Sequence, residues 1–150
     1  MEFKDFMDLP PLTDGIIELV CTAKNAAEPK KGWVPAYAFD ICVDGERVGF
    51  VNLRVGFTDA LYYSGQIGYI VDEAHRGNGY ALRACRLLVP VLNFHKMQKV
   101  LICTEVSNIA SNRICEKLGA KLIDTCPVPD WHDTYEQEGW RTANIYEWGW

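Results

Sequence analysis

One six-residue segment combines the residue types that bind a phosphate group. Residues 76–81 read Arg-Gly-Asn-Gly-Tyr-Ala; they follow an apolar run at residues 67–71 and precede a helical pattern that starts near Tyr80. A strand, a glycine-rich turn and a helix N-terminus in this order present unpaired backbone N–H groups and the positive end of a helix dipole. The segment predicts an anion site, and a phosphate-bearing cofactor is the first candidate. A plain tight turn before a helix is the alternative.

The composition limits which partners this chain can have. The 150 residues carry a formal charge of -5 at pH 7, so no net basic field exists to attract a nucleic acid, and an amine partner fits better. Six cysteines occur singly, without a C-x-x-C pair, which predicts packing cysteines of a reducing compartment and no metal site. No apolar run approaches the roughly 20 residues that span a bilayer. We therefore expect a cytoplasmic protein without membrane or nucleic-acid partners.

The elements that must position the glycine turn follow from hydrophobic periodicity. At this length, and with 49% hydrophobic residues, residues 1–150 are expected to form a single domain. The pattern predicts the order ββββαβαββ, and Asp44-Gly45 marks a hairpin. Pro90 should kink or break the first helix. The expected strands cover residues 16–21, 36–43, 47–56, 66–71, 99–104, 121–125 and 143–148, and the expected helices cover residues 80–96 and 109–118. The fourth and fifth strands, joined by a helix, should run parallel.

Several motifs in this order resemble the GNAT superfamily of acyl-CoA N-acyltransferases. The resemblance spans roughly residues 16–148 and is strongest over 65–123. The segments that carry it are residues 66–71, 76–81, 108–111 and 116–120. The last two segments are more similar to the branch that acetylates ribosomal-protein N-termini and polyamines. The resemblance implies an α/β (α+β) GNAT-type fold, with a mixed central sheet of about seven strands splayed between strands 4 and 5 and with helices on both faces.

The resemblance also implies where an acetyl-CoA cosubstrate binds. The glycine turn would hold the coenzyme A pyrophosphate, and the pantetheine arm would lie between the splayed strands. Ile70 and Asp72 would bond the arm through their backbones, with the Ile70 N–H near the thioester carbonyl. Asn108 and Ser111 match family positions near the arm, although helix capping explains them equally well. The cofactor residues are therefore expected to be Ile70, Val71, Asp72, Arg76, Gly77, Asn78, Gly79, Tyr80, Ala81, Asn108 and Ser111.

Two positions depart from the family pattern. Gln66 stands where many members have a glutamate base, and glutamine cannot accept the proton of an ammonium group. Cys115 stands where many members have a tyrosine that protonates the leaving thiolate; a thiol could do so, or it could simply pack. Glu105, at the end of the fifth strand, is the carboxylate candidate for a base, against the alternative of a solvated side chain. The catalytic candidates are thus Glu105 and Cys115.

Further candidates lie elsewhere in the chain. His132 and Asp133 come third as catalytic groups, whereas His75 and His95 are expected at the surface. The acidic and aromatic loop at residues 127–142 suits a cation and commonly borders the acceptor site in this fold; an exposed loop anchored by tryptophans is the alternative.

The segment between the first two strands limits how the acceptor site is covered. It is short, at residues 22–35, which predicts an open acceptor cleft unless a second subunit covers it. Trp148-Gly149-Trp150 could serve such a homodimer interface.

The main functional hypothesis is an acetyl-CoA-dependent N-acetyltransferase acting directly on a primary amine of a small molecule or a peptide N-terminus. A non-catalytic acyl-CoA-binding sensor or interaction domain is the alternative, which Gln66 and Cys115 favour.

Overall fold

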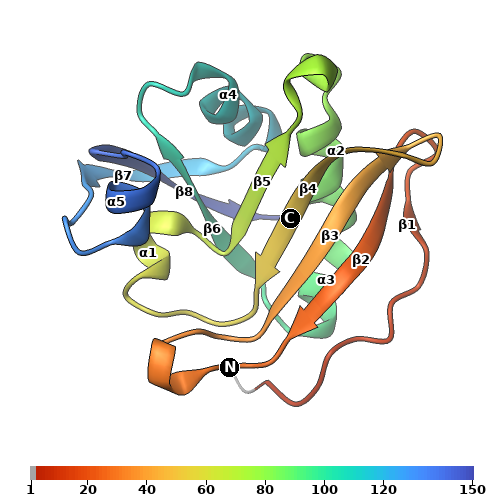
Figure 1. Ribbon diagram of the computed structural model, residues 1–150, viewed down its shortest axis with the longest axis horizontal. Coiled ribbons are helices and arrows are strands. Elements are labelled where there is room, and N and C mark those ends of the chain that lie inside the picture. The colour runs from red at the N-terminus through yellow and green to blue at the C-terminus, as the bar shows by residue number, and fades with distance from the viewer. Residues whose placement is uncertain (1–2) are drawn as a thin grey trace.

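The strands form two sheets that meet at one point (Figure 1). The computed structural model describes residues 3–150, so residues 1 and 2 of the expected domain lie outside it. The first sheet is antiparallel and contains β1 (Leu12–Thr13), β2 (Glu18–Asn25), β3 (Ala36–Val43), β4 (Glu46–Arg54) and β5 (Ile67–Val71), in that order. The second sheet has the order β6-β8-β7, with β6 (Lys99–Glu105), β7 (Lys121–Pro127) and β8 (Thr142–Gly149).

The splay expected between residues 66–71 and 99–104 is present between β5 and β6. The two strands share a single isolated bridge, of antiparallel type, between Gly65 and Ile102. Beside it the Gln66 N–H donates to the Leu101 carbonyl over 2.8 Å. Figure 1 shows β5 and β6 diverging from this junction toward their carboxyl ends. β5 and β6 thus belong to different sheets, as the predicted splay requires, and one edge of β5 stays open.

The helix predicted over residues 80–96 is divided in two. α2 (Tyr80–Leu87) ends at Leu88, and α3 (Val89–Phe94) begins there with a proline in its first turn. Pro90 lacks the N–H that would continue α2, but its ring fits the first turn of a new helix. The predicted apolar face is buried, because Ala81, Ala84, Cys85, Leu88 and Leu92 are all at most 5% exposed. These helices pack against the first sheet in one cluster with Tyr37, Phe39 and Leu53.

Three further helices complete the fold. α4 (Ile109–Leu118) has the bounds that the sequence predicts, with Asn108 as N-cap and Gly119 as a left-handed C-cap. α1 (Leu61–Ser64) and α5 (Asp133–Gln137) were not predicted, because helices of four and five residues are too short to show periodicity. The first predicted strand, residues 16–21, is β2, which continues to Asn25, and the rest of the 22–35 segment contains a 3-10 turn at Pro29–Lys31 beside a bridge between Glu28 and Trp33. No helix in the described part of the chain is long and apolar enough to cross a membrane.

Two surface predictions are wrong. His95 is 8% exposed, stacks on Phe3 and places its Nε2 2.6 Å from the Tyr37 hydroxyl oxygen. Trp148 is 3% exposed in the main core. Trp150 alone of the final pair is exposed, and its indole N–H donates to Asn93 Oδ1.

Candidate active site

The glycine turn presents free donors at the start of α2. Gly77 and Gly79 have φ angles of 87° and 76°, a backbone conformation that glycine adopts without a Cβ penalty. The first backbone bond of α2 runs from the Arg83 N–H to the Gly79 carbonyl, and no side chain caps the helix. The N–H groups of residues 80–82 therefore have no partner within the helix. A Cβ built on either glycine meets no atom within 4 Å, so the turn borders open space.

These donors line a groove of about 260 Å³ between β5, α2 and α4. The structure brings all the expected cofactor residues to this groove except Asp72. The groove is lined by Tyr69, Ile70, Val71, His75, Arg76, Gly77, Asn78, Gly79, Tyr80, Ala81, Asn108, Ala110, Ser111 and Ile114. The sequence interpretation missed Tyr69, His75, Ala110 and Ile114, of which Tyr69 and Ile114 are recognisable only once α4 is placed beside β5.

The open edge of β5 offers different backbone groups from those expected. The Asp72 N–H donates to the Val48 carbonyl, and the Asp72 side chain pairs with Arg47 at 3.4 Å, away from the groove. In the antiparallel register with β4, Ile70 opposes Phe50, so its N–H also points toward β4. The same alternation turns the N–H groups of Tyr69 and Val71 toward the opening between β5 and β6. The prediction that the Ile70 and Asp72 backbones face the opening is thus wrong by one residue. A sequence does not show toward which neighbouring strand each backbone N–H points.

The N-terminus of α4 is joined to the groove by side-chain hydrogen bonds. Asn108 Oδ1 accepts from the Ser111 N–H over 3.1 Å, which is the capping role foreseen as an alternative. The Ser111 hydroxyl lies 2.8 Å from the Tyr69 hydroxyl. Burial raises the pKa of the Tyr69 phenol far above its ordinary value. Tyr69 is therefore a neutral phenol at the groove wall.

Asn112 anchors this helix end, although no sequence signal singled it out. Its Oδ1 accepts hydrogen bonds from Thr104 at 2.6 Å, Asn144 at 2.9 Å and Tyr146 at 3.0 Å. Its Nδ2 donates to the carbonyls of Glu105, Val106 and Asn108. One amide thereby ties α4 to both β6 and β8 and fixes one wall of the groove. A second asparagine directly after the Asn-x-x-Ser segment is the signal that could have found it.

The Gln66 side chain forms hydrogen bonds at the junction of the two sheets. Its Oε1 accepts from the Leu101 N–H over 2.8 Å, and its Nε2 donates to the Gly56 carbonyl over 2.7 Å. The residue is 7% exposed. The amide oxygen and the amide nitrogen each bond a backbone group that has no partner in a β-ladder. The side chain therefore stabilises the point from which β5 and β6 diverge.

The two predicted catalytic residues lie outside the groove lining. Cys115 is fully buried in the main core, and burial raises the pKa of its thiol to about 12. A packing role, foreseen as its alternative, accounts for this environment. Glu105 Oε2 accepts from the Ser107 N–H at 2.9 Å and from the Ser107 hydroxyl, which makes it a cap of the turn between β6 and α4. The carboxylate is placed by that local turn and not by the groove.

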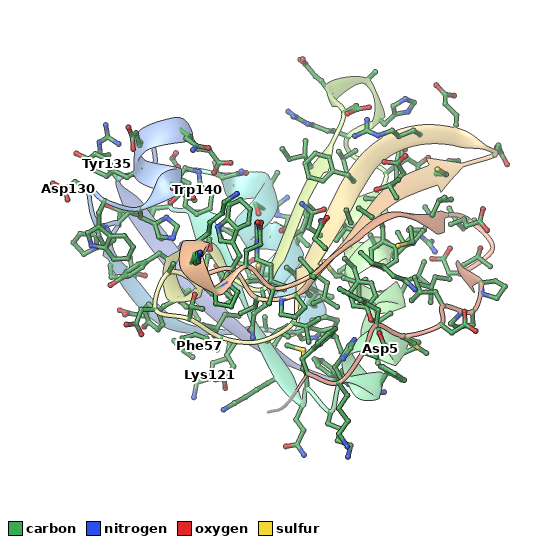
Figure 2. The ribbon with its side chains drawn as sticks, turned by 60° about the horizontal axis from the view of Figure 1, so that its bottom comes forward. Asp5, Phe57, Lys121, Asp130, Tyr135 and Trp140 are labelled. Carbon is green, nitrogen blue, oxygen red and sulfur yellow. The ribbon has the colours of Figure 1, made fainter. Side chains whose placement is uncertain are left out.

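A second cavity, of about 560 Å³, lies beside the sheet junction, between the 25–36 segment, α1 and α5. His132 and Asp133 line it, and so does Arg54. His132 is 4% exposed; its Nδ1 accepts from the Thr134 N–H and its Nε2 therefore donates to the Ala60 carbonyl over 2.7 Å. It fastens α5 to α1 and has no free nitrogen. Figure 2 shows Asp130, Tyr135 and Trp140 gathered around α5, far from Asp5 in the N-terminal segment.

The fold and the groove can be compared with known proteins. RimL, a ribosomal L7/L12 alpha-N-protein acetyltransferase in complex with coenzyme A, has a TM-score of 0.68 at 14% identity over 93% of this chain and 98% of that chain. An acetyltransferase from Salmonella typhimurium that modifies the N-terminal serine of L7/L12 has a TM-score of 0.59 at 18% identity over 81% of this chain and 66% of that chain. The microcin C7 self immunity acetyltransferase MccE, in complex with acetyl-CoA and AMP, has a TM-score of 0.58 at 18% identity, with 77% of this chain and 61% of that chain covered.

Not every relative is matched over its full length. This chain covers 62% of the length of a structure described as a probable acetyltransferase, at a TM-score of 0.61 and 22% identity. The comparison with curated sequences finds no match. At these identities the structural likeness concerns the fold. The family model described as "Acetyltransferase (GNAT) domain" matches residues 3–121, and the chain therefore belongs to the GNAT acetyltransferase family.

Proposed function

We propose that this protein is an acetyl-CoA-dependent N-acetyltransferase that transfers the acetyl group directly to a primary amine of a small molecule or a peptide N-terminus. The observation that carries the proposal is the groove that joins the uncapped start of α2 to the open edge of β5. A pyrophosphate fits the first part, since each hydrogen bond to a charged group contributes about 1.5–3 kcal/mol. An extended arm with amide groups fits the second part, because the free N–H groups of Tyr69 and Val71 point there.

Direct transfer to an acceptor that starts as an ammonium removes two protons from nitrogen, one before attack, which goes to solvent, and one as the amide forms, which balances the protonation of the departing thiolate. The amine nitrogen attacks the thioester carbon, the carbon–sulfur bond breaks, and the amide and the free thiol of coenzyme A are the products. A backbone N–H of the β5 edge would stabilise the oxyanion by a few kcal/mol. The Tyr69 hydroxyl, held by Ser111, would donate a hydrogen bond to the departing sulfur; because burial raises its pKa, it remains protonated.

The described residues offer no evident general base for this mechanism. Gln66 and His132 are both committed to backbone groups. An alkyl amine of pKa about 10.4 needs about 4.6 kcal/mol to lose its proton at pH 7, whereas an α-amino group of pKa near 8 needs about 1.4 kcal/mol. An acceptor with a weakly basic amine therefore suits this site.

Replacement of one glycine tests the cofactor groove. Gly79→Trp should keep the fold, because its side chain enters open space, although the left-handed backbone at this position strains any residue other than glycine. It should abolish coenzyme A binding in calorimetry while the circular dichroism spectrum stays unchanged. Gly139→Trp is the matched control, a glycine with φ 74° in the loop after α5. Unchanged affinity in Gly79→Trp would exclude the groove as the pyrophosphate site.

Turnover separates the enzyme from the alternative, a non-catalytic acyl-CoA-binding sensor. The sensor is considered because Gln66 and Cys115, which stand where many family members have catalytic groups, both have structural roles here. Thiol release from acetyl-CoA should depend on added amine, and Tyr69→Phe should lower kcat about ten- to a hundredfold with coenzyme A affinity retained. Tight cofactor binding without amine-dependent thiol release would establish the sensor instead.

A further inference from the structure

Arg54 has an environment that neither the fold nor the proposed chemistry explains. It ends β4, a strand whose inward residues Val48, Val51 and Leu53 are at most 1% exposed. Its side chain lies across Gly68 of β5, where a Cβ would come within 3.5 Å of Nη1. A glycine at this position leaves the space that the guanidinium occupies. The group thus lies on the face of the sheet opposite the core helices and lines the second cavity.

The guanidinium has few partners for its five donors. Its one side-chain hydrogen bond among residues 3–150 runs from Nη1 to the Gly65 carbonyl, at a long 3.3 Å. None of the ion pairs found within 4.0 Å in the described chain includes Arg54. Burial lowers the pKa of the guanidinium, and the charge of Glu138 opposes this only in part. Arg54 is half-buried, and the guanidinium N–H groups that do not bond Gly65 are open to the cavity, so a carboxylate that enters the cavity would meet unpaired donors.

Arg47 provides a contrast on the same strand. Its guanidinium is exposed and pairs with Asp40 at 3.1 Å and with Asp72 at 3.4 Å. The same residue type thus finds two carboxylates at the exposed end of β4 and none at the end that lines the cavity. Among the described residues, the lack of a carboxylate within ion-pair distance of Arg54 is therefore specific to its position in the cavity.

Arg54 places one wall of the cavity at the junction of the two sheets. Its backbone N–H donates to the Gln66 carbonyl, and its side chain bonds Gly65, so it stands at the junction from which β5 and β6 diverge. The cavity lining also includes three exposed carboxylates, those of Glu28, Asp133 and Glu138. The cavity thus combines one cation, at the sheet junction, with acids from the 25–36 segment and from α5 and its C-terminal end.

We propose that the second cavity is the acceptor site and that it selects a primary amine whose molecule also carries a carboxylate, which Arg54 binds. The inference rests on the proposed function and names the acceptor class for it. A fork of guanidinium N–H groups matches a carboxylate in two parallel hydrogen bonds, and the acids of α5 attract the ammonium group before transfer. A polyamine, with a cation at each end, is disfavoured because one of its charges would meet Arg54.

Binding to the unliganded protein tests this assignment without turnover. The Nε–H resonance of Arg54, assigned by its loss in Arg54→Gln, should shift saturably with glycine, β-alanine or γ-aminobutyrate and remain in place with the corresponding carboxamides. Carboxamides that shift the resonance equally, or carboxylates that leave it in place, would overturn the proposal.

Comparison of kcat/KM values provides a second test. The carboxylate member of at least one amino acid and carboxamide pair, or of a pair of peptide amides beginning with Asp or Asn, should have a kcat/KM about ten- to a hundredfold higher. Arg54→Gln should remove that preference with coenzyme A affinity unchanged, Arg54→Lys should keep part of it, and Arg47→Gln is the control that keeps all of it. The free amino acids and the peptides separate the two sources of the carboxylate.

The outcomes also separate this inference from the proposed function. Acetylation of carboxamides or spermidine at the rate of the carboxylates would refute the role of Arg54 and leave the acetyltransferase standing. Failure of coenzyme A to bind would refute the acetyltransferase, and the Arg54 resonance would still decide whether the cavity binds carboxylates.

Discussion

Gln66→Glu restores the residue that many family members use as a base, and the structure predicts that it weakens the protein. The carboxylate keeps the hydrogen bond from the Leu101 N–H but loses the donor that faces the Gly56 carbonyl at 2.7 Å. Two outcomes compete at this 7% exposed position. Either the bond to Gly56 breaks, at about 1–3 kcal/mol for an unsatisfied buried acceptor, or the carboxyl stays protonated, which costs about 4 kcal/mol near pH 7.4 from a reference pKa near 4.3.

The smaller cost wins, so Gln66→Glu should lose about 1–3 kcal/mol of unfolding free energy at pH 7.4. At pH 5 protonation costs only about 1 kcal/mol, and the protonated carboxyl donates to Gly56 again. The folded state then binds more protons than the unfolded state, so stability should fall as pH rises above about 4.3. Denaturant midpoints at both pH values measure this.

The control is Gln98→Glu, the same change at an exposed glutamine. Equal stability of the two variants at pH 7.4 would refute the idea that the hydrogen bonds of Gln66 stabilise the sheet junction. A rise in kcat with stability retained would show that the position is free to act as a base.

Three other residues give shorter tests. Cys115→Ala should keep kcat within about twofold while losing about 1 kcal/mol of stability from the fully buried position, and a hundredfold loss of kcat would place the thiol in the chemistry. Asn112→Ala should cost about 2–4 kcal/mol, because six hydrogen bonds converge on its amide, whereas Asn93→Ala should change unfolding by well under half of that. Burial lowers the pKa of His95 in the folded state, so its contribution is fully present above the unfolded pKa of about 6.5 and declines as pH falls through that value; His95→Gln should flatten this slope in thermal melts, and an unaltered slope would exclude His95 as its source.

Elements with a local signature were predictable from sequence. The bounds of α4 follow from an asparagine cap and a terminal glycine, and the break before α3 follows from Pro90. The glycine turn was equally clear, because both its conformation and its donors depend on neighbouring residues. By contrast, α1, α5 and the strand β1 are too short to produce a periodic pattern.

Side-chain roles that depend on distant partners were not predictable. The two partners of Gln66 lie 10 and 35 residues away, and those of Asn112 reach 34 residues along the chain. Nothing near Arg54 in the sequence shows that it lacks a carboxylate, since that depends on the relative placement of β4, α1 and α5. The cofactor groove could thus be predicted from a motif, whereas the acceptor cavity required the fold.

The occupation of Gln66 and Cys115 by the fold does not by itself favour a sensor over an enzyme. A positioned general base contributes about 10²–10⁴-fold, or roughly 3–5 kcal/mol, to a transfer reaction. Correct positioning of the two reactants contributes more, about 7–11 kcal/mol, and in the proposed arrangement it depends on how the groove and the cavity hold the two reactants. An acceptor amine of pKa near 8 recovers about 3 kcal/mol relative to an alkyl amine at pH 7, nearly the whole value of a base. The choice of acceptor can therefore replace most of the contribution of the missing glutamate, and the role proposed for Arg54 concerns the positioning of the acceptor rather than the pKa of its amine.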